Sequence, residues 1–205
     1  MNAIPKKFLK GKRSFITKLS PEVSGNNTGS FCVFPADVHF SGQDSHESVV
    51  LIVRRHPAVF IPQYLTIIGL LLAPFLFMVT FGSDDGFSPI YKFGIWLLFL
   101  LIAFTAAIDT YLKWYYTVNI ITDSRIIDVD FTNILFHRFS EAQLDKIEDV
   151  SHSPAGVLSS IFDYGDVYIQ TAGSKPEFEF GGIPRPRDVQ DTLLDLLEMK
   201  KKGDI

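Results

Sequence analysis

The histidines are the residues of this chain best suited to acid–base or metal chemistry, and their spacing favours neither. They are His39, His46, His56, His137 and His152. No two have the HxxxH or HExxH spacing that holds a catalytic zinc ion. His152 follows the acidic pair Glu148–Asp149, and a histidine beside a carboxylate can act as a general base. No nucleophile motif such as GxSxG accompanies it. The sequence therefore predicts a non-enzymatic protein without catalytic residues, metal site or cofactor.

Two arginines near the carboxyl terminus could contact an anion. Arg185 and Arg187 flank Pro186, just before the last predicted helix. Free N–H groups at a helix amino terminus attract phosphate. Asp188 competes for the same helix end, so capping and solvation are the alternative role for this segment. The glycines form neither GxGxxG nor GxxxxGK[ST], so no phosphate-binding loop and no small-molecule substrate are predicted.

The most prominent elements of the sequence are two long apolar runs. Residues 58–81 contain no charged side chain, and residues 93–108 form a second uncharged run. A bilayer core about 30 Å thick needs about 20 apolar residues as helix. The second run reaches that length when residues 90–92 join it. We predict a membrane hairpin within residues 49–114, with spans at about 58–81 and 90–112.

The cations around these runs indicate an orientation. Arg54 and Arg55 precede the first span and Lys113 follows the second, whereas Lys92 is the only base near the connecting loop. The positive-inside rule then places both termini in the cytoplasm and the loop outside. Asp109 is the one acid near the end of the second span, and pairing with Lys113 four residues later is its simplest role.

The first 48 residues have the composition of a basic arm followed by a flexible linker. Residues 1–18 carry six bases and no acid, and residues 20–48 are rich in Ser, Gly, Asn and Asp. Such an arm suits anionic lipid headgroups at about 1 kcal/mol per charge, and a solvated tail is the alternative. Beyond Phe8 and Phe15 it lacks the interleaved aromatic residues of a nucleic-acid-binding segment. The single cysteine, Cys32, agrees with a reducing compartment.

Residues 115–199 have the pattern of a compact β-rich domain, followed by a tail over residues 200–205. Short apolar and β-branched segments between turn residues are typical of strands. We predict strands over residues 115–122, 125–131, 135–140, 147–152, 167–171 and 177–180, with a helical turn over residues 157–163.

A closing helix is predicted from its periodicity. Val189, Leu193, Leu196 and Leu197 fall at i, i+4, i+7 and i+8, which makes one apolar stripe. Acids near its amino end and lysines near its carboxyl end complement the helix dipole. We expect this helix to cover an open sheet or barrel.

Several short motifs, taken in order, resemble the bacterial pleckstrin-homology-like (PH-like) membrane proteins of the two-span type, formerly a domain of unknown function. They are Glu47-x-Val49, Arg54-Arg55-His56-Pro57, Thr122-Asp123-Ser124-Arg125-Ile126, Asp145-Lys146-Ile147-Glu148-Asp149-Val150 and Tyr164-Gly165-Asp166-Val167-Tyr168-Ile169, followed by the closing helix. The resemblance covers residues 47–198. It implies an α+β fold: a split β-barrel of about six to seven strands after a two-helix transmembrane hairpin, capped by the carboxyl-terminal helix. It also implies a binding or assembly module and carries no established catalytic residues.

A set of basic, aromatic and aliphatic residues is expected at the membrane interface. They are Arg54, Arg55, Trp114, Tyr115, Phe131, Ile134 and Phe136. For the last three, packing beneath the barrel is the alternative. Residues 115–205 carry 16 acids and nine bases, so the domain is a poor phosphoinositide clamp. A protein partner or a homo-oligomer is expected instead.

These observations together predict a multi-pass protein of the bacterial cytoplasmic (inner) membrane. Its partners would be the lipid bilayer and a protein or further copies of itself, not nucleic acid. An accessory subunit of a transport or envelope complex is the alternative. A membrane-bound hydrolase needs a nucleophile that the sequence does not supply.

Overall fold

A computed structural model of the chain describes residues 29–35, 40, 42–81, 88–133, 136–154, 156–172 and 177–203. The chain forms two compact units. One unit is Pro57–Tyr115. The other, which we call the domain, joins Met1–His56 to Tyr116–Ile205. The domain is therefore built from chain segments on both sides of the first unit.

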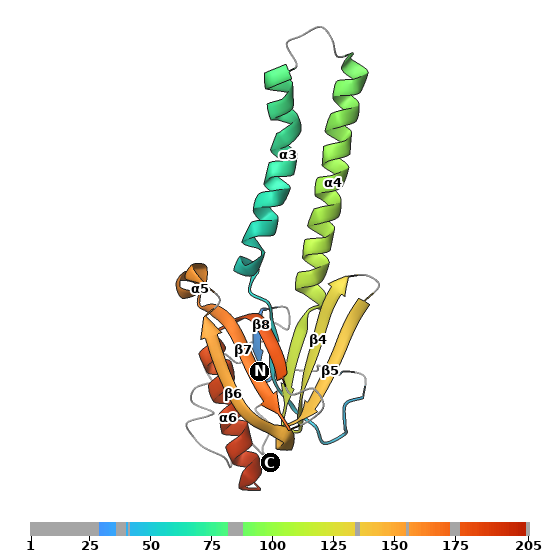
Figure 1. Cartoon of the computed structure of the whole chain (residues 1–205). Helices are drawn as coiled ribbons and strands as arrows, with labels where there is room; N and C mark the ends of the chain where they lie inside the picture. The colour runs from blue at the N-terminus through green and yellow to red at the C-terminus, as the bar shows by residue number, and fades with distance from the viewer. Residues whose placement is uncertain are drawn as a thin grey trace. The chain divides into compact units, whose positions relative to one another are not determined.

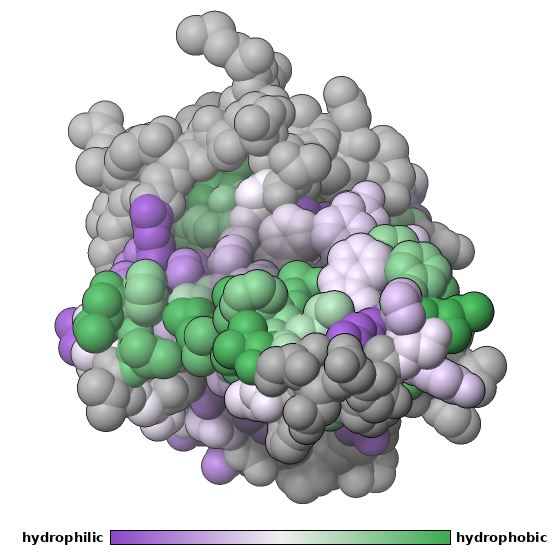
Figure 2. Space-filling model, turned by 90° about the horizontal axis from the view of Figure 1, so that it is seen from above, coloured by the Kyte–Doolittle hydropathy of each residue, from purple (hydrophilic) through white to green (hydrophobic). Residues whose placement is uncertain are grey.

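The unit Pro57–Tyr115 consists of two long apolar helices. The 3-10 turn η2 (Pro57–Phe60) leads into α3 (Ile61–Phe81), and α4 (Pro89–Tyr116) follows. Both helices are long and apolar enough to cross a membrane. Most of their large apolar side chains are exposed. Figure 2 shows hydrophobic residues gathered across the middle of the face seen from above, with more polar residues among them. The two predicted apolar helices are confirmed.

The domain contains two antiparallel sheets (Figure 1). The five-stranded sheet has the order β1 (Phe31–Val33), β2 (Val49–Arg54), β3 (Val118–Thr122), β4 (Arg125–Asn133) and β5 (Phe136–Gln143). The three-stranded sheet has the order β6 (Ile147–Pro154), β7 (Tyr164–Thr171) and β8 (Glu177–Pro184). The 3-10 turn η3 (Leu144–Lys146) links the sheets, α5 (Val157–Phe162) joins β6 to β7, and α6 (Pro186–Lys201) closes the chain. The predicted mixture of helix and sheet is confirmed.

Two strands form from segments that were predicted to belong to the linker and to the hairpin region. Residues 49–54, assigned to the hairpin region, form β2, and residues 31–33, assigned to the linker, form β1. All residues of β2 except Arg54 are buried. A strand buried on both faces loses the alternation that identifies a strand in sequence, so this run was read as the approach to a span. The described part of the domain therefore has eight strands, and the expected six to seven is wrong.

The remaining strands fall close to their predicted positions. β3 begins three residues later than predicted, at Val118, because α4 extends through Tyr116, and β8 continues four residues further than predicted, to Pro184. The tight turn at Asp123 and Ser124 joins β3 to β4 as expected. The predicted helical turn is α5, and the closing helix is α6.

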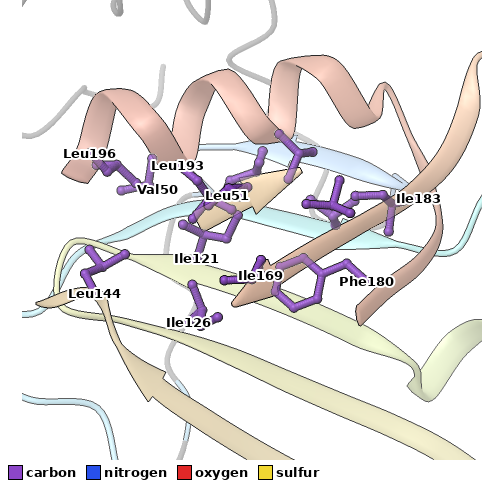
Figure 3. Close-up of a cluster of buried hydrophobic side chains, with 14 of the residues drawn as sticks. Val50, Leu51, Ile121, Ile126, Leu144, Ile169, Phe180, Ile183, Leu193 and Leu196 are labelled. Carbon is purple, nitrogen blue, oxygen red and sulfur yellow. The ribbon is translucent and has the colours of Figure 1, made fainter. Parts of the chain in front are cut away.

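The main core lies between the two sheets and α6 (Figure 3). Leu193 and Leu196 of α6 are fully buried, as are Leu51 of β2, Ile169 of β7 and Phe180 of β8. Figure 3 shows side chains from all these elements directed into the same interior space. Burying a side chain of this size contributes about 1.5–3 kcal/mol. The predicted apolar stripe of the last helix is thus the face that closes the core.

Candidate functional site

The domain has one end at which the chain leaves it and returns. It leaves after His56 and returns at Tyr116. Close to these points Arg54 of β2 pairs with Val118 of β3, so the two connections lie on neighbouring antiparallel strands. We call this the attachment end.

An ion pair and an aromatic pair stand at the attachment end beside the β3–β4 ladder. Arg55 Nη2 lies 3.3 Å from Asp130 Oδ1, with both side chains about one-third exposed. The rings of Tyr116 and Phe131 are 5.3 Å apart. The Phe131 N–H also donates to Thr117 Oγ1 at 3.4 Å. Two predicted interface residues, Arg55 and Phe131, are therefore close to the points where the chain enters and leaves.

His56 fixes β8 and α5 to the same end. Its N–H donates to the Gly182 carbonyl at 2.7 Å. Its ring stacks on Tyr164, with centroids 5.7 Å apart and planes 9° apart, and lies 6.3 Å from the Phe162 ring. Burial lowers the pKa of His56, while the nearby Asp163 carboxylate opposes that shift. This histidine is held as a neutral packing group rather than as an exposed base.

The two candidate anion contacts lie where α6 begins. Arg185 is in the left-handed backbone region at φ +50°, and its N–H donates to the Asp163 carbonyl at 2.9 Å. Its guanidinium carbon lies 5.5 Å from the centre of the Phe31 ring, within cation–π range. Arg187 is exposed in the first turn of α6. Arg185 is thus partly committed to an internal contact, and anion binding by this pair stays a prediction.

The other expected interface residues fall in three places. Arg54 is at the attachment end. Trp114 and Tyr115 belong to α4, where their rings lie 6.2 Å and 5.9 Å from Tyr111. Ile134 and the side chain of Phe136 lie outside the described residues. The structure therefore gathers Arg54, Arg55, Phe131, Arg185 and Arg187 at one end of the domain, and their role toward a membrane stays a prediction.

The polar pair expected in the second apolar helix is present. Lys113 Nζ lies 2.6 Å from Asp109 Oδ2, one helical turn away. An exposed i,i+4 pair of this kind contributes only about 0.3–0.5 kcal/mol. The simplest role predicted for Asp109, pairing with Lys113, is therefore present.

His152 is engaged by an amide rather than by a carboxylate. Its Nδ1 forms a hydrogen bond with Gln190 Oε1, and Gln190 Nε2 donates to the Val150 carbonyl at 2.6 Å. These bonds tie β6 to α6. The side chain of His137 lies outside the described residues. Among the described residues, no group of three or more His, Cys, Asp and Glu side chains could hold a metal ion.

A buried ion pair, which the sequence analysis did not foresee, stands at the other end of β2. The Glu47 side chain is 1% exposed. Its Oε1 accepts from Thr122 Oγ1 at 2.7 Å and from Arg125 Nε at 3.0 Å, and its Oε2 accepts from Arg125 Nη2 at 2.9 Å. The Asp44 N–H donates to the same carboxylate at 3.1 Å. Burial alone raises the pKa of Glu47, but the hydrogen bonds from Arg125 and Thr122 outweigh it and lower the pKa.

The same arginine reaches further partners. Arg125 Nη1 donates to Glu141 Oε2 at 3.0 Å, and its Nη2 donates to the Gly42 carbonyl at 2.6 Å. The Phe40 ring lies 5.7 Å from the guanidinium carbon. Two of the family-like motifs, around Glu47 and around Thr122 to Ile126, therefore meet in space. An acid just before an apolar strand and an arginine after a tight turn were the sequence signals for this contact.

A cavity of about 420 Å³ lies between β5 and the end of the β7–β8 hairpin. Its lining includes Phe139, Glu141, Gln143, Lys146, Thr171 and Phe178. β5 is the last strand of its sheet, so the backbone groups on its outer edge have no partner strand. The lining also includes Arg125 and Ser140, so apolar, hydroxyl and charged groups share it.

Comparison with known proteins agrees with this architecture. A family model described as "Bacterial PH domain" matches residues 58–197, which is more than half of the chain. Among solved structures, a DUF1696 family protein with a pleckstrin-homology domain from Shewanella loihica PV-4 is similar at 14% identity, with a TM-score of 0.32. That match covers 40% of this chain and 70% of the other. No curated protein matches the chain. The chain belongs to the bacterial PH domain family.

Proposed function

We propose that this chain is a non-enzymatic, membrane-anchored binding or assembly module. One observation carries the proposal: the PH-like domain is assembled from strands on both sides of two apolar helices. β2 ends just before α3, and β3 begins just after α4. A domain joined by two covalent connections to membrane-spanning helices is held close to the bilayer, where it can present a binding surface.

The connections also favour a hairpin of two spans. At 1.5 Å per residue, the 21 residues of α3 extend about 32 Å and the 28 residues of α4 about 42 Å, and each exceeds a bilayer core of about 30 Å. The chain leaves and re-enters the sheet on the neighbouring strands β2 and β3. Spans that start from and return to one side must cross the bilayer an even number of times. Residues 82–87 would then lie on the far side.

The charges beside the spans favour a cytoplasmic domain. Arg54 and Arg55 belong to the domain and Lys113 precedes its second segment by three residues, whereas Lys92 is the one base near the far connection. The positive-inside rule then places the domain and both termini in the cytoplasm of a bacterial cell, at its inner membrane. The lone buried Cys32 is compatible with that reducing compartment.

The ligand that the chemistry favours is a protein, either a partner or a second copy of this chain. The net charge of −7 over residues 115–205 disfavours a phosphoinositide headgroup. Catalysis is disfavoured because the candidate base His152 is bonded to Gln190. The alternative is an accessory subunit of a transport or envelope complex, and the exposed apolar side chains of α3 and α4 are the observation that supports it.

Native mass spectrometry of the full chain, extracted with its own lipids, tests the proposal. We expect a homo-oligomer or a stoichiometric complex with a second protein. A matched chain separates the two alternatives: residues 29–56 linked directly to residues 116–203 by a loop of about four residues, which suffices for neighbouring antiparallel strands. We call it the joined domain. If the joined domain retains the assembly, the domain is the binding module. If only the full chain retains it, the helices carry the contact, as for an accessory subunit. A full chain that is monomeric and carries only lipid would contradict both.

A further inference from the structure

We propose that α5 is a membrane-inserting element: its outward apolar face enters the lipid interface beside the attachment end. The proposal rests on the membrane anchoring described above. It concerns Leu158, Ile161 and Phe162, three residues without a place in the domain core.

α5 exposes Ser160 and its described apolar side chains and buries Ser159, which is unusual for a helix on a soluble domain. A surface helix normally buries its apolar stripe and exposes its polar face. In α5 the side chains of Leu158, Ile161 and Phe162 are 41%, 71% and 45% exposed, while Ser159 is buried at 2% exposure. The three apolar residues stand at i, i+3 and i+4, so they share one face. Contact with water does not stabilise exposed apolar side chains, so an aqueous environment does not explain this arrangement.

The apolar exposure of the domain is concentrated on this short helix. In the described part of the domain, the large hydrophobic residues that are exposed are Tyr116, Phe139, Leu158, Ile161, Phe162 and Leu194. Three of these six belong to the six residues of α5. A fourth, Tyr116, is the residue at which the chain returns from the apolar helices. Exposed apolar patches of this kind mark interaction surfaces.

The position of α5 favours lipid as the environment that its exposed apolar side chains contact. The Phe162 ring lies 6.3 Å from the ring of His56, the last residue of the domain before the first apolar helix. In Figure 1, α5 lies at the opposite end of the domain from the carboxyl end of α6. A span that begins at Pro57 brings the headgroup region to the residues beside His56. The apolar face of α5 therefore lies beside the point at which the chain would enter the membrane.

A backbone bond fixes the carboxyl end of α5 in the orientation that exposes its apolar face. Ser159 Oγ donates to the Gly156 carbonyl, and the Asp163 N–H donates to the Ser159 carbonyl. The Arg185 N–H then donates to the Asp163 carbonyl at 2.9 Å, which links the end of α5 to the start of α6. α5 is therefore fixed at its carboxyl end, with Ser159 facing inward and Ile161 outward, and burial of Ile161 in this conformation requires an external apolar phase.

The charged groups nearest α5 are of both signs. Asp163 follows the helix, and the Arg185 N–H donates to its main-chain carbonyl. Arg187 is exposed two residues further along, beside the exposed Asp188. Arg55, beside the same attachment end, is paired with Asp130. The proposal therefore rests on the apolar face of α5 rather than on charge.

Depth-dependent quenching on the full chain tests the proposal. In a Cys32→Ala background, single cysteines replace Ile161, Leu194 or Leu76 and carry an environment-sensitive nitrobenzoxadiazole probe. The protein is placed in vesicles of phosphatidylethanolamine and phosphatidylglycerol that contain lipids with a nitroxide near the top of the acyl chain. Leu194 is the matched control, because it is exposed at 44% on α6. Leu76 reports on α3 itself.

We expect the probe at residue 161 to emit further to the blue than the probe at residue 194. We also expect it to be quenched by the lipid nitroxide roughly twofold or more strongly, as for an interfacial helix inserted about 5–10 Å deep. Equal, weak quenching at residues 161 and 194, with strong quenching at residue 76, overturns the proposal and leaves the membrane anchor intact. A blue-shifted but unquenched probe at residue 161 overturns it in favour of a protein contact. Absence of quenching at residue 76 overturns the anchor and this inference together.

Discussion

A fragment of residues 116–203 is expected to be unfolded or aggregated, whereas the joined domain is expected to fold as a soluble protein. β2 lies inside the five-stranded sheet, between β1 and β3. Val50, Leu51 and Val53 of β2 are fully buried. Without β2, the fragment loses these contacts and exposes the edge of β3, which invites aggregation. At about 1.5–3 kcal/mol for each fully buried side chain, this loss is comparable with the whole stability of a small domain.

Circular dichroism and amide NMR spectra of the two proteins check this prediction. The joined domain should show dispersed amide resonances and a cooperative thermal transition, and the fragment should show neither. The joined domain also serves as the matched control, because both proteins lack the apolar helices. A folded, cooperative fragment of residues 116–203 would mean that β2 is dispensable and that the domain lies wholly after the second helix.

Replacing Glu47 with glutamine is expected to lower the free energy of unfolding of the joined domain by about 3 kcal/mol, the lower end of the range for breaking a buried ion pair. Glu47 is 1% exposed and neutralises Arg125, whose side chain is 20% exposed. The amide cannot accept from Arg125 and Thr122 with the same charge-assisted strength. The guanidinium still bonds Glu141, which is why the lower end applies.

Glu141→Gln is the matched control. It also removes a carboxylate that pairs with the Arg125 guanidinium, but the Glu141 side chain is 51% exposed. An exposed pair contributes about 1 kcal/mol or less. Urea titrations of the three proteins give the comparison directly. Equal losses for Glu47→Gln and Glu141→Gln would show that burial of Glu47 adds nothing to the strength of its ion pair.

The effect of Glu47→Gln on the free energy of unfolding depends on pH. The pKa of Glu47 is lowered in the folded domain, so the unfolded chain binds its proton more tightly than the folded one. The stabilisation is complete above the ordinary glutamate pKa and is lost as the pH falls through the folded value. The free energy of unfolding of Glu47→Gln should therefore fall less steeply at acidic pH than that of the unchanged joined domain.

The elements that were predicted from the sequence are those determined by residues close together along the chain. The stripe of Val189, Leu193 and Leu196 sets the buried face of α6, because helical periodicity alone defines it. The two apolar helices follow from length and composition. The predicted turn at Asp123 and Ser124 is present for the same reason.

Features that depend on distant partners were missed. β2 is apolar from Val49 to Val53 because it is buried on both faces, so it lacks the alternation that identifies a strand in sequence. Glu47 and Arg125 meet across 78 residues of sequence, so their pairing needed the fold. Helical periodicity in α5 gives a face but not its direction, and only the structure shows that Ile161 points outward.

The accessibility of two engineered cysteines tests the membrane-anchored arrangement most directly. Ser88 precedes α4 on the far connection, and Ser153 lies on β6 of the domain; both are exposed. Each is replaced by cysteine in the Cys32→Ala full chain and treated with a membrane-impermeant maleimide in intact spheroplasts, then after permeabilisation. The account predicts that the cysteine at residue 88 reacts in intact spheroplasts and the cysteine at residue 153 only after permeabilisation. Labelling of both cysteines under the same condition would contradict it, because the two apolar helices would then not place the loop and the domain on opposite sides of a membrane.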